Sequence, residues 1–285
     1  MKRATRCQRV TQLLIFACLL LSRGTTLRAQ EARPPISTDE AAQQEGAESQ
    51  SGSTNRPRYV VRRNHRPDGT GRFYMGREIA PVMPFGGGGG AWLERLNRDE
   101  EENLRALVEA LELEPGMIVA DIGAGTGRLS IPMAERVAPD GKVLAVDVQD
   151  EMLSFLSKKL KQLRIENVEP ILGTPKSPKL DPESVDLALF VDVYHEFTFP
   201  YEMMVEISEA LKPGGRAVLV EYRKEDPRVP IKPLHKMSQS QVKKEIGQAE
   251  LRLRWKETID VLPRQHIIVF EKVAREEAKI PAVPE

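Results

Sequence analysis

Residues 119–130 read VADIGAGTGRLS and join an apolar run to three glycines at alternate positions. Residues 117–122 are apolar except for Asp121, which is typical of a strand buried on both faces of a parallel sheet. A helical pattern begins at Leu129, directly after the last glycine. The start of a helix leaves backbone N–H groups unpaired, and glycines let a ligand approach them closely. The stretch therefore predicts a strand, a glycine turn and a helix that bind a polar or anionic small molecule.

The spacing of the glycines distinguishes between cofactors. Gly123, Gly125 and Gly127 form G-x-G-x-G, whereas nicotinamide and flavin binders use G-x-G-x-x-G. With Asp121 just before the first glycine, the segment resembles motif I of the class I S-adenosylmethionine-dependent methyltransferases. The alternative interpretation is a glycine-rich turn of some other α/β protein.

A second apolar segment, residues 143–148, strengthens the resemblance. Asp147 lies near its end, 20 residues after Gly127 (147 − 127). A carboxylate at this place can accept hydrogen bonds from both ribose hydroxyls of a nucleoside ligand. The other interpretation is an acidic cap for the helix that begins at Asp150. We expect Asp147 to be partly exposed without ligand, so that its replacement costs the fold little.

The segment LKPGG at residues 211–215 is a further signature of the same family, and the resemblance extends over residues 99–273. It implies an α/β fold, a doubly wound, mostly parallel seven-stranded sheet with an antiparallel C-terminal hairpin (Rossmann-like). It implies S-adenosyl-L-methionine as the cofactor. The chain is most similar to the type-11 small-molecule methyltransferases, the neighbourhood of quinone and arsenite methyltransferases. The residues that this resemblance assigns to cofactor binding are Asp121, Gly123, Gly125, Gly127, Asp147, Thr174 and Asp192. Thr174 stands where many relatives place an acid near the adenine amino group, so that contact is weaker here.

Candidate catalytic residues follow the predicted fourth strand, residues 184–193. In the resembled family this position lies beside the transferred methyl group, and His195 would act as the base with Asp192 and Tyr194 as orienting groups. The alternatives are a structural histidine and a backbone-bonded acid. A fifth strand is predicted at residues 217–220, and a proline-rich, charged segment follows it. We assign to substrate contacts the residues Glu221, Tyr222, Arg223 and His235, which lie in or beside this segment.

The rest of the composition excludes several kinds of site. No His, Cys or Glu pair has the spacing of a metal motif, so the sequence gives no support for a metal site. Lys and Arg together equal Asp and Glu at 42 each, so no global charge attracts nucleic acid or an anionic membrane. The sequence names no oligomeric state.

Residues 1–30 read as a signal peptide. A basic segment with four Lys and Arg residues precedes an apolar core at residues 13–21, which is too short to span a bilayer comfortably. Cleavage near Ala29 would export the protein to the periplasm or the medium and remove both cysteines, Cys7 and Cys18. An uncleaved N-terminal membrane anchor and a lipoprotein modified at Cys18 are the alternatives. Export conflicts with a cofactor that is made in the cytoplasm.

The remaining segments differ in composition. Residues 31–71 predict a disordered linker that ends in a basic arm, and the arm is expected to fold back on the domain rather than to bind nucleic acid or lipid. Residues 72–98 predict a lid or collar with a flexible glycine hinge at residues 86–90. Residues 274–285 form a charged tail.

The sequence thus favours S-adenosylmethionine-dependent methyl transfer to an unidentified, small-molecule acceptor. An exported, non-catalytic module that binds the cofactor or a partner is the alternative. A nicotinamide reductase is disfavoured by the glycine spacing and by the lack of a Tyr-x-x-x-Lys pair.

Overall fold

The computed structural model describes residues 57–274. The predicted signal peptide, the linker up to residue 56 and the tail after residue 274 lie outside the described residues. Among residues 57–274, no helix is both long and apolar enough to cross a membrane.

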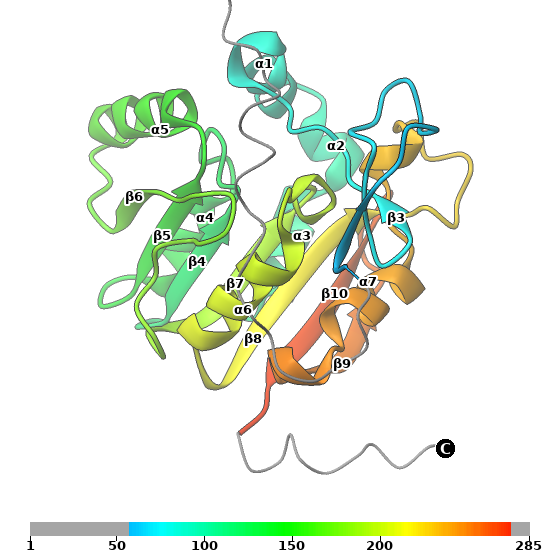
Figure 1. Cartoon of the computed structure of the whole chain (residues 1–285). Helices are drawn as coiled ribbons and strands as arrows, with labels where there is room; N and C mark the ends of the chain where they lie inside the picture. The colour runs from blue at the N-terminus through cyan, green and yellow to red at the C-terminus, as the bar shows by residue number, and fades with distance from the viewer. Residues whose placement is uncertain (1–56, 275–285) are drawn as a thin grey trace, which may run out of the picture. The chain divides into compact units, whose positions relative to one another are not determined.

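A seven-stranded sheet forms the centre of the domain, in the order β6-β5-β4-β7-β8-β10-β9 (Figure 1). Its first five strands run parallel to one another, and β10 is antiparallel to both β8 and β9. The predicted fold class, with its antiparallel C-terminal hairpin, is therefore confirmed. The strands are β4 (Ile118–Ile122), β5 (Lys142–Asp147), β6 (Val168–Leu172), β7 (Val185–Val191), β8 (Leu211–Tyr222), β9 (Leu253–Ile259) and β10 (Gln265–Lys272).

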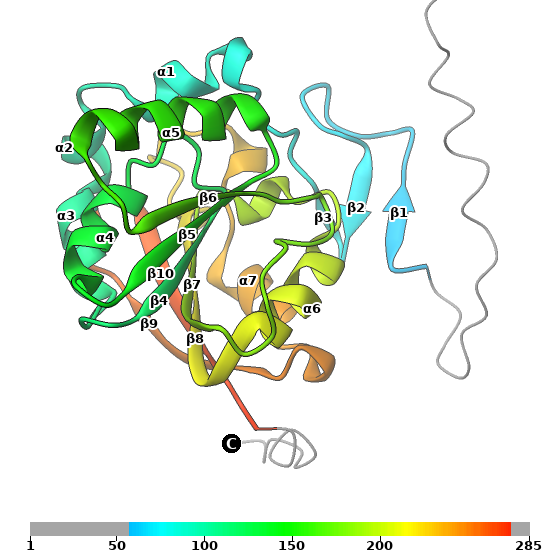
Figure 2. The same cartoon turned by 90° about the vertical axis from the view of Figure 1, so that its left-hand side faces the viewer.

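Helices cover both faces of this sheet, as the strands that are apolar on both sides require. One buried cluster joins the sheet to α3 (Leu104–Ala110), α4 (Ser130–Val137) and α5 (Asp150–Leu163). The other joins the opposite face to α6 (Pro200–Ala210) and α7 (Gln239–Ile246). Figure 2 shows the two groups of helices on opposite sides of the sheet.

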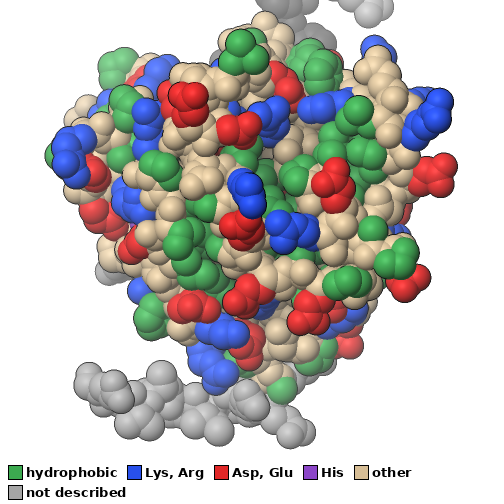
Figure 3. Space-filling model, turned by 180° about the vertical axis from the view of Figure 1, so that it is seen from behind, with side chains coloured by type: hydrophobic (Ala, Val, Ile, Leu, Met, Phe, Trp, Pro, Cys, Tyr) green, Lys and Arg blue, Asp and Glu red, His purple; other side chains and the backbone are tan. Residues whose placement is uncertain are grey.

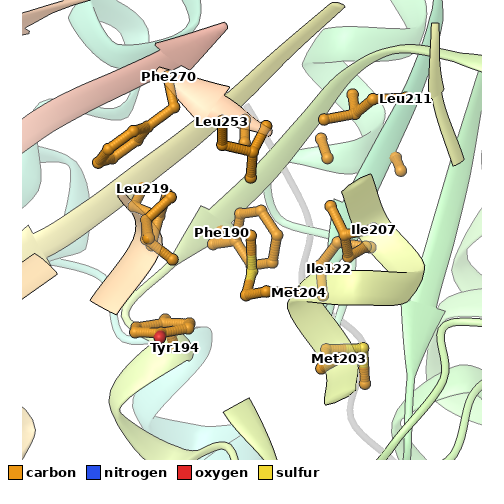
Figure 4. Packing of buried hydrophobic residues seen from close by; sticks show 14 of the residues in the cluster. Ile122, Phe190, Tyr194, Met203, Met204, Ile207, Leu211, Leu219, Leu253 and Phe270 are labelled. Carbon is orange, nitrogen blue, oxygen red and sulfur yellow. The ribbon is translucent and has the colours of Figure 1, made fainter. Parts of the chain in front are cut away.

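Successive strand residues alternate between the two clusters. In β7, for example, Leu187 and Leu189 belong to the first cluster, and Ala188 and Phe190 to the second. Figure 4 shows the second cluster, in which Phe190 packs among side chains from α6 and the neighbouring strands. Parallel pairing of β4 with β5 and with β7 places the carboxyl ends of these three strands side by side, and that edge carries the candidate site.

Residues before the sheet pack on its α6 side. The strands β1 (Tyr59–Val61), β2 (Arg72–Tyr74) and β3 (Arg77–Glu78) form a small antiparallel sheet. The Tyr59 hydroxyl donates a hydrogen bond to Glu202 of α6, and the Arg72 guanidinium donates to the Thr198 carbonyl at 3.0 Å. The described part of the basic arm thus lies against the domain.

The glycine-rich segment that follows is helical, which corrects the expectation of a flexible hinge. A short 3-10 helix, η2 (Phe85–Gly87), leads into α1 (Gly89–Leu93), and α2 (Arg98–Glu102) comes next. The amide of Phe85 donates to the Gln149 side chain at 2.9 Å, and the Gln149 amide donates to the Met83 carbonyl at 3.1 Å. Tertiary contacts at the sheet edge therefore order a segment whose own composition is flexible.

Charged side chains of both signs are mixed over one face of the domain. Figure 3 shows acidic and basic groups interspersed on the face opposite to that of Figure 1. This face carries no single-sign patch of the kind that binds nucleic acid.

Candidate active site

A cavity of about 470 Å³ opens at the carboxyl ends of β4, β5 and β7. Ligands of open α/β sheets bind at this edge. The cavity is lined by residues of the glycine turn, by the segments after β5 and β7, by residues 82–98 and by the loop after β8. The lining includes Val82, Met83, Trp92, Leu93, Arg98, Gly123, Gly125, Asp147, Gln149, Met152, Asp192, His195, Glu196, Phe197, Tyr222, Ile231, Lys232 and His235.

The glycine turn has the backbone that its sequence predicts. Gly123, Gly125 and Gly127 have φ angles of 73°, 54° and 74°, a region that side chains with a Cβ atom rarely adopt. Gly125 faces the cavity, and a Cβ atom added there would come within 2.6 Å of the Leu93 side chain. Leu93, which also lines the cavity, therefore packs where a side chain at Gly125 would lie. Gly127 does not line the cavity. Leu156 of α5 occupies the space that a Cβ atom at Gly127 would need.

Asp147 lines the cavity, but the expectation that it is partly exposed is wrong. Its relative exposure is only 7%, and both carboxylate oxygens accept backbone hydrogen bonds, from Gly125 N and Gln149 N, each at 2.9 Å. Burial raises the pKa of Asp147, against the opposing effect of these two amides. The carboxylate therefore stabilises the glycine turn and is also held in a fixed orientation toward the cavity.

Asp121 does not line the main cavity; it borders a smaller one beneath the glycine turn. Its carboxylate accepts a hydrogen bond of 2.6 Å from the Ser130 hydroxyl at the start of α4. Burial raises the pKa of Asp121 to about 6. In the free protein this acid joins β4 to α4, so a direct cofactor contact stays a prediction.

Thr174 is also outside the cavity lining, although its neighbour Pro175 contributes to it. The Thr174 hydroxyl accepts a hydrogen bond from Ser177 N at 3.0 Å within a local turn. The predicted adenine contact would need this turn to share its hydroxyl.

Asp192 lines the cavity with an unusual carboxyl group. One oxygen accepts from the Gln265 amide at 2.7 Å, and the other is buried with no hydrogen-bond partner among residues 57–274. Burial, followed by the charges of Glu102 and Glu221, raises the pKa of Asp192 well above its ordinary value. A buried polar atom without a partner is costly. The unpartnered oxygen is therefore suited to a hydrogen bond with a polar ligand group.

Tyr194 differs from its neighbours because its ring is fully buried in the core beside Phe190 and Phe197 and does not line the cavity (Figure 4). His195 does line the cavity, with only 1% of its surface exposed. Its Nδ1 lies 2.6 Å from Glu221 Oε2, and its Nε2 lies 3.1 Å from His235 Nδ1. The structure thus brings together His195, Glu221 and His235, three of the residues that the sequence marks.

The four predicted substrate residues separate into two groups. His235 and Tyr222 line the cavity, and the Tyr222 hydroxyl donates to Glu102 at 2.7 Å. Glu221 is buried behind His195, so it acts on that imidazole rather than on a ligand. Arg223 donates instead to the loop between β9 and β10, including Asp260 at 3.2 Å.

Several lining residues carry no signal in the sequence. Gln149 and Lys232 reach the cavity from loops, Glu196 from the short 3-10 helix after β7, and Arg98 from α2. Arg98 donates to Glu102 at 2.9 Å, an ion pair within one helical turn. Such residues are placed by loop conformation, which pattern and spacing do not encode.

The comparisons with known proteins agree with this geometry. The family model described as "Methyltransferase domain" matches residues 113–264, more than half of the chain, and the chain belongs to this family. The demethylmenaquinone methyltransferase of Lactococcus lactis is 30% identical over 106 residues, which cover 37% of this chain and 42% of that enzyme. The chain spans less than half of the length of the curated relatives that it matches.

Solved structures show the same fold. A SAM-dependent methyltransferase from Aquifex aeolicus has a TM-score of 0.60 at 23% identity, over 65% of this chain and 97% of that one. A Burkholderia thailandensis 1,6-didemethyltoxoflavin-N1-methyltransferase with bound S-adenosylhomocysteine has a TM-score of 0.50 at 18% identity, over 70% and 97%. These structures show the fold, and the match to the family model confirms at the level of the family the predicted class, an S-adenosylmethionine-dependent methyltransferase, and its cofactor.

The cavity fits that cofactor. Asp147 offers a fixed acceptor, Gly123 and Gly125 line the wall beside it without side chains, and Asp192 offers an oxygen without a partner. A sulfonium cation with a ribose and an amino acid moiety would bind to these groups.

Proposed function

We propose that this protein transfers the methyl group of S-adenosylmethionine to a small, largely apolar acceptor that carries an ionisable group. The observation that carries the proposal is that one cavity has cofactor-motif residues on one side and a separate cluster of polar side chains on the other. The glycine turn and Asp147 lie on its cofactor side, and His195, Glu196 and His235 form a polar cluster that the cofactor motif does not need.

The size and lining of the cavity support a small acceptor. Ligand pockets commonly measure about 300–1,000 Å³ and combine apolar walls with a few polar groups. Val82, Trp92, Phe197 and Ile231 supply apolar walls here, and the histidines supply the polar groups. The relatives include a demethylmenaquinone methyltransferase and a ubiquinone/menaquinone biosynthesis C-methyltransferase.

The chemistry needs only modest help from the protein. The acceptor atom forms a bond to the methyl carbon, the carbon–sulfur bond breaks, and its electron pair stays on sulfur as a neutral thioether. Holding the two reactants in line can supply on the order of 7–11 kcal/mol. A protonated acceptor must also lose a proton, and His195 Nε2 is oriented to accept it because Glu221 holds Nδ1.

Equilibrium titration of the full chain with S-adenosylmethionine, S-adenosylhomocysteine and NAD tests the cofactor, and methyl transfer to a panel of phenols, quinols and amines tests the reaction. We expect both methionine derivatives to bind and NAD not to bind. Binding without transfer to any acceptor would favour the alternative, a non-catalytic module. Preferred binding of NAD would refute the proposal.

We extend the proposal to location, since the basic and apolar segments of residues 1–30 favour export. Fractionation of cells that express the full chain, with immunodetection in each fraction, tests this. Recovery of the protein with its N-terminus intact in the soluble cytoplasmic fraction would overturn it.

A further inference from the structure

Two short 3-10 helices bring three metal-ligating side chains together at the cavity. The first, η3 (Tyr194–Glu196), follows β7 and carries His195 and Glu196. The second, η4 (Pro233–His235), lies in the loop after β8 and carries His235. The nitrogen or oxygen atoms of these three side chains all lie within 4.8 Å of one another, and all three residues line the cavity.

The distances between these atoms match a tetrahedral metal site. His195 Nε2 lies 3.1 Å from His235 Nδ1 and 3.9 Å from Glu196 Oε1, and His235 Nδ1 lies 3.3 Å from Glu196 Oε1. Ligands bound tetrahedrally to Zn²⁺ at about 2.0–2.1 Å stand roughly 3.3–3.4 Å apart. The measured values bracket this edge length, so small side-chain shifts would complete the site.

His195 and Glu196 are each held in place by a hydrogen-bond contact at the side-chain atom that would not bind the metal. His195 Nδ1 lies 2.6 Å from Glu221 Oε2, which directs Nε2 toward the cavity. Glu196 Oε2 accepts a hydrogen bond from Met83 N at 3.3 Å, which directs Oε1 toward the histidines. A carboxylate behind a histidine ligand is the usual outer shell of a zinc site, because it fixes the ring and strengthens its basicity.

The charges around the cluster also favour a cation. Glu196 and Glu221 bring two carboxylates to the histidine pair. Arg77 lies close by and donates to the His195 carbonyl, but both of its other hydrogen bonds go to Glu245, at 2.8 and 2.9 Å. Lys232 is the cationic side chain that shares the cavity wall on this side. A divalent ion would balance the two carboxylates.

We propose that His195 Nε2, Glu196 Oε1 and His235 Nδ1 bind a divalent transition-metal ion, with Zn²⁺ as the best match. Two histidines and one glutamate form a ligand set that suits Zn²⁺ and leaves one coordination position open. Because the three side chains line the cavity, that position faces the acceptor.

The ion would define the acceptor class, and this step rests on the proposed function. A hydroxyl group of a phenol or an enol would bind the ion through oxygen, and its O–H bond would break with release of the proton to water. The oxygen would then form a bond to the methyl carbon as the carbon–sulfur bond breaks. The ion would take the place of His195 as the activating group.

The test is a calorimetric Zn²⁺ titration of the untagged full chain after treatment with a chelator, with Mg²⁺ as the comparison ion. We expect one equivalent of Zn²⁺ to bind and Mg²⁺ not to bind, because Mg²⁺ prefers oxygen ligands. His235→Ala and Glu196→Gln should each weaken Zn²⁺ binding by more than the roughly 10- to 100-fold that loss of an outer-shell group causes. Glu221→Gln should fall within that range.

His65→Ala is the matched control, because His65 lies on the arm between β1 and β2 and outside the cavity lining. Its Zn²⁺ affinity should equal that of the unchanged protein. Failure of the full chain to bind Zn²⁺, or Zn²⁺ binding that survives both His235→Ala and Glu196→Gln, would overturn the metal site. S-adenosylhomocysteine affinity is measured on the same samples. If the unchanged protein does not bind S-adenosylhomocysteine, the proposed function is contradicted. If it binds S-adenosylhomocysteine but not Zn²⁺, only the metal site is contradicted.

Discussion

Asp147→Ala is expected to weaken S-adenosylmethionine binding by roughly 10- to 150-fold and also to destabilise the free protein. The loss of affinity follows from hydrogen bonds to a charged group, which contribute about 1.5–3 kcal/mol. The loss of stability follows from the structure, in which Gly125 N and Gln149 N both donate to this carboxylate. Leaving such buried donors without a partner costs about 1–3 kcal/mol. For a domain of this size, that corresponds to a fall in Tm of about 2–12 °C.

Asp147→Asn separates the two roles. Its amide oxygen can still accept one of the two backbone hydrogen bonds, but its NH2 group faces the other backbone N–H, so only part of the stability should return. The second oxygen becomes a donor and cannot accept from a ribose hydroxyl, so the affinity should stay low. Calorimetric titration gives the affinity and thermal melting of the free protein gives the stability.

Asp150→Ala is the control for this experiment. Asp150 is an exposed acid in the first turn of α5 and does not line the cavity. Its loss should leave affinity unchanged and lower stability by no more than about 1 kcal/mol, the usual value of an acid at a helix start. Full cofactor affinity in Asp147→Ala, or recovery of both properties in Asp147→Asn, would show that Asp147 is only structural.

Four further predictions follow from other parts of the chain. Gly127→Ala should lower Tm, because φ is 74° and the new Cβ would overlap Leu156, yet it should affect cofactor affinity less than Asp147→Ala does. The pKa of Asp121 is raised to about 6, so the protonated carboxyl group contributes fully to the stability of the fold below about pH 4, and this contribution is lost as the pH rises through 6. In thermal melting, Tm should therefore fall less between pH 4 and pH 6 for Asp121→Asn than for the unchanged protein. His195→Ala should lower turnover by roughly 10²- to 10⁴-fold with cofactor affinity nearly unchanged, and parallel losses in both would return His195 to a structural role. N-terminal sequencing of the native protein should find a mature chain that begins near residue 30, and an intact Met1 would contradict the proposed cleavage.

Local sequence was a poor guide where tertiary contacts compete with it. Asp99 and Glu102 have the spacing of a capping box, and the apolar residues that follow have helical spacing, so the sequence alone predicts one helix from Asp99. The structure divides this segment into α2 and α3 at Asn103, which has a φ of 52°. Glu102 at the end of α2 is buried, and Arg95, Arg98 and Tyr222 donate to it. These three partners fix the position of Glu102, and α3 begins after the turn at Asn103.

By itself the sequence determined the fold class, the family and the cofactor. These properties depend on short-range features, namely apolar strands of regular length, three glycines that need positive φ angles, and Asp147 at a fixed distance along the chain. Each of these features lies within a short stretch of sequence, so it can be recognised without knowing which distant segments meet in the fold.

Only the tertiary structure decided how the site is built. His195 and His235 are separated by 40 residues and by strand β8, and they meet because η3 and η4 pack together above the sheet. Tyr194, one residue from His195, is in the core, because the tight turn after β7 directs adjacent side chains to opposite sides. Burial and distance of this kind arise from how loops close over the sheet, and neither periodicity nor spacing along the chain contains that information.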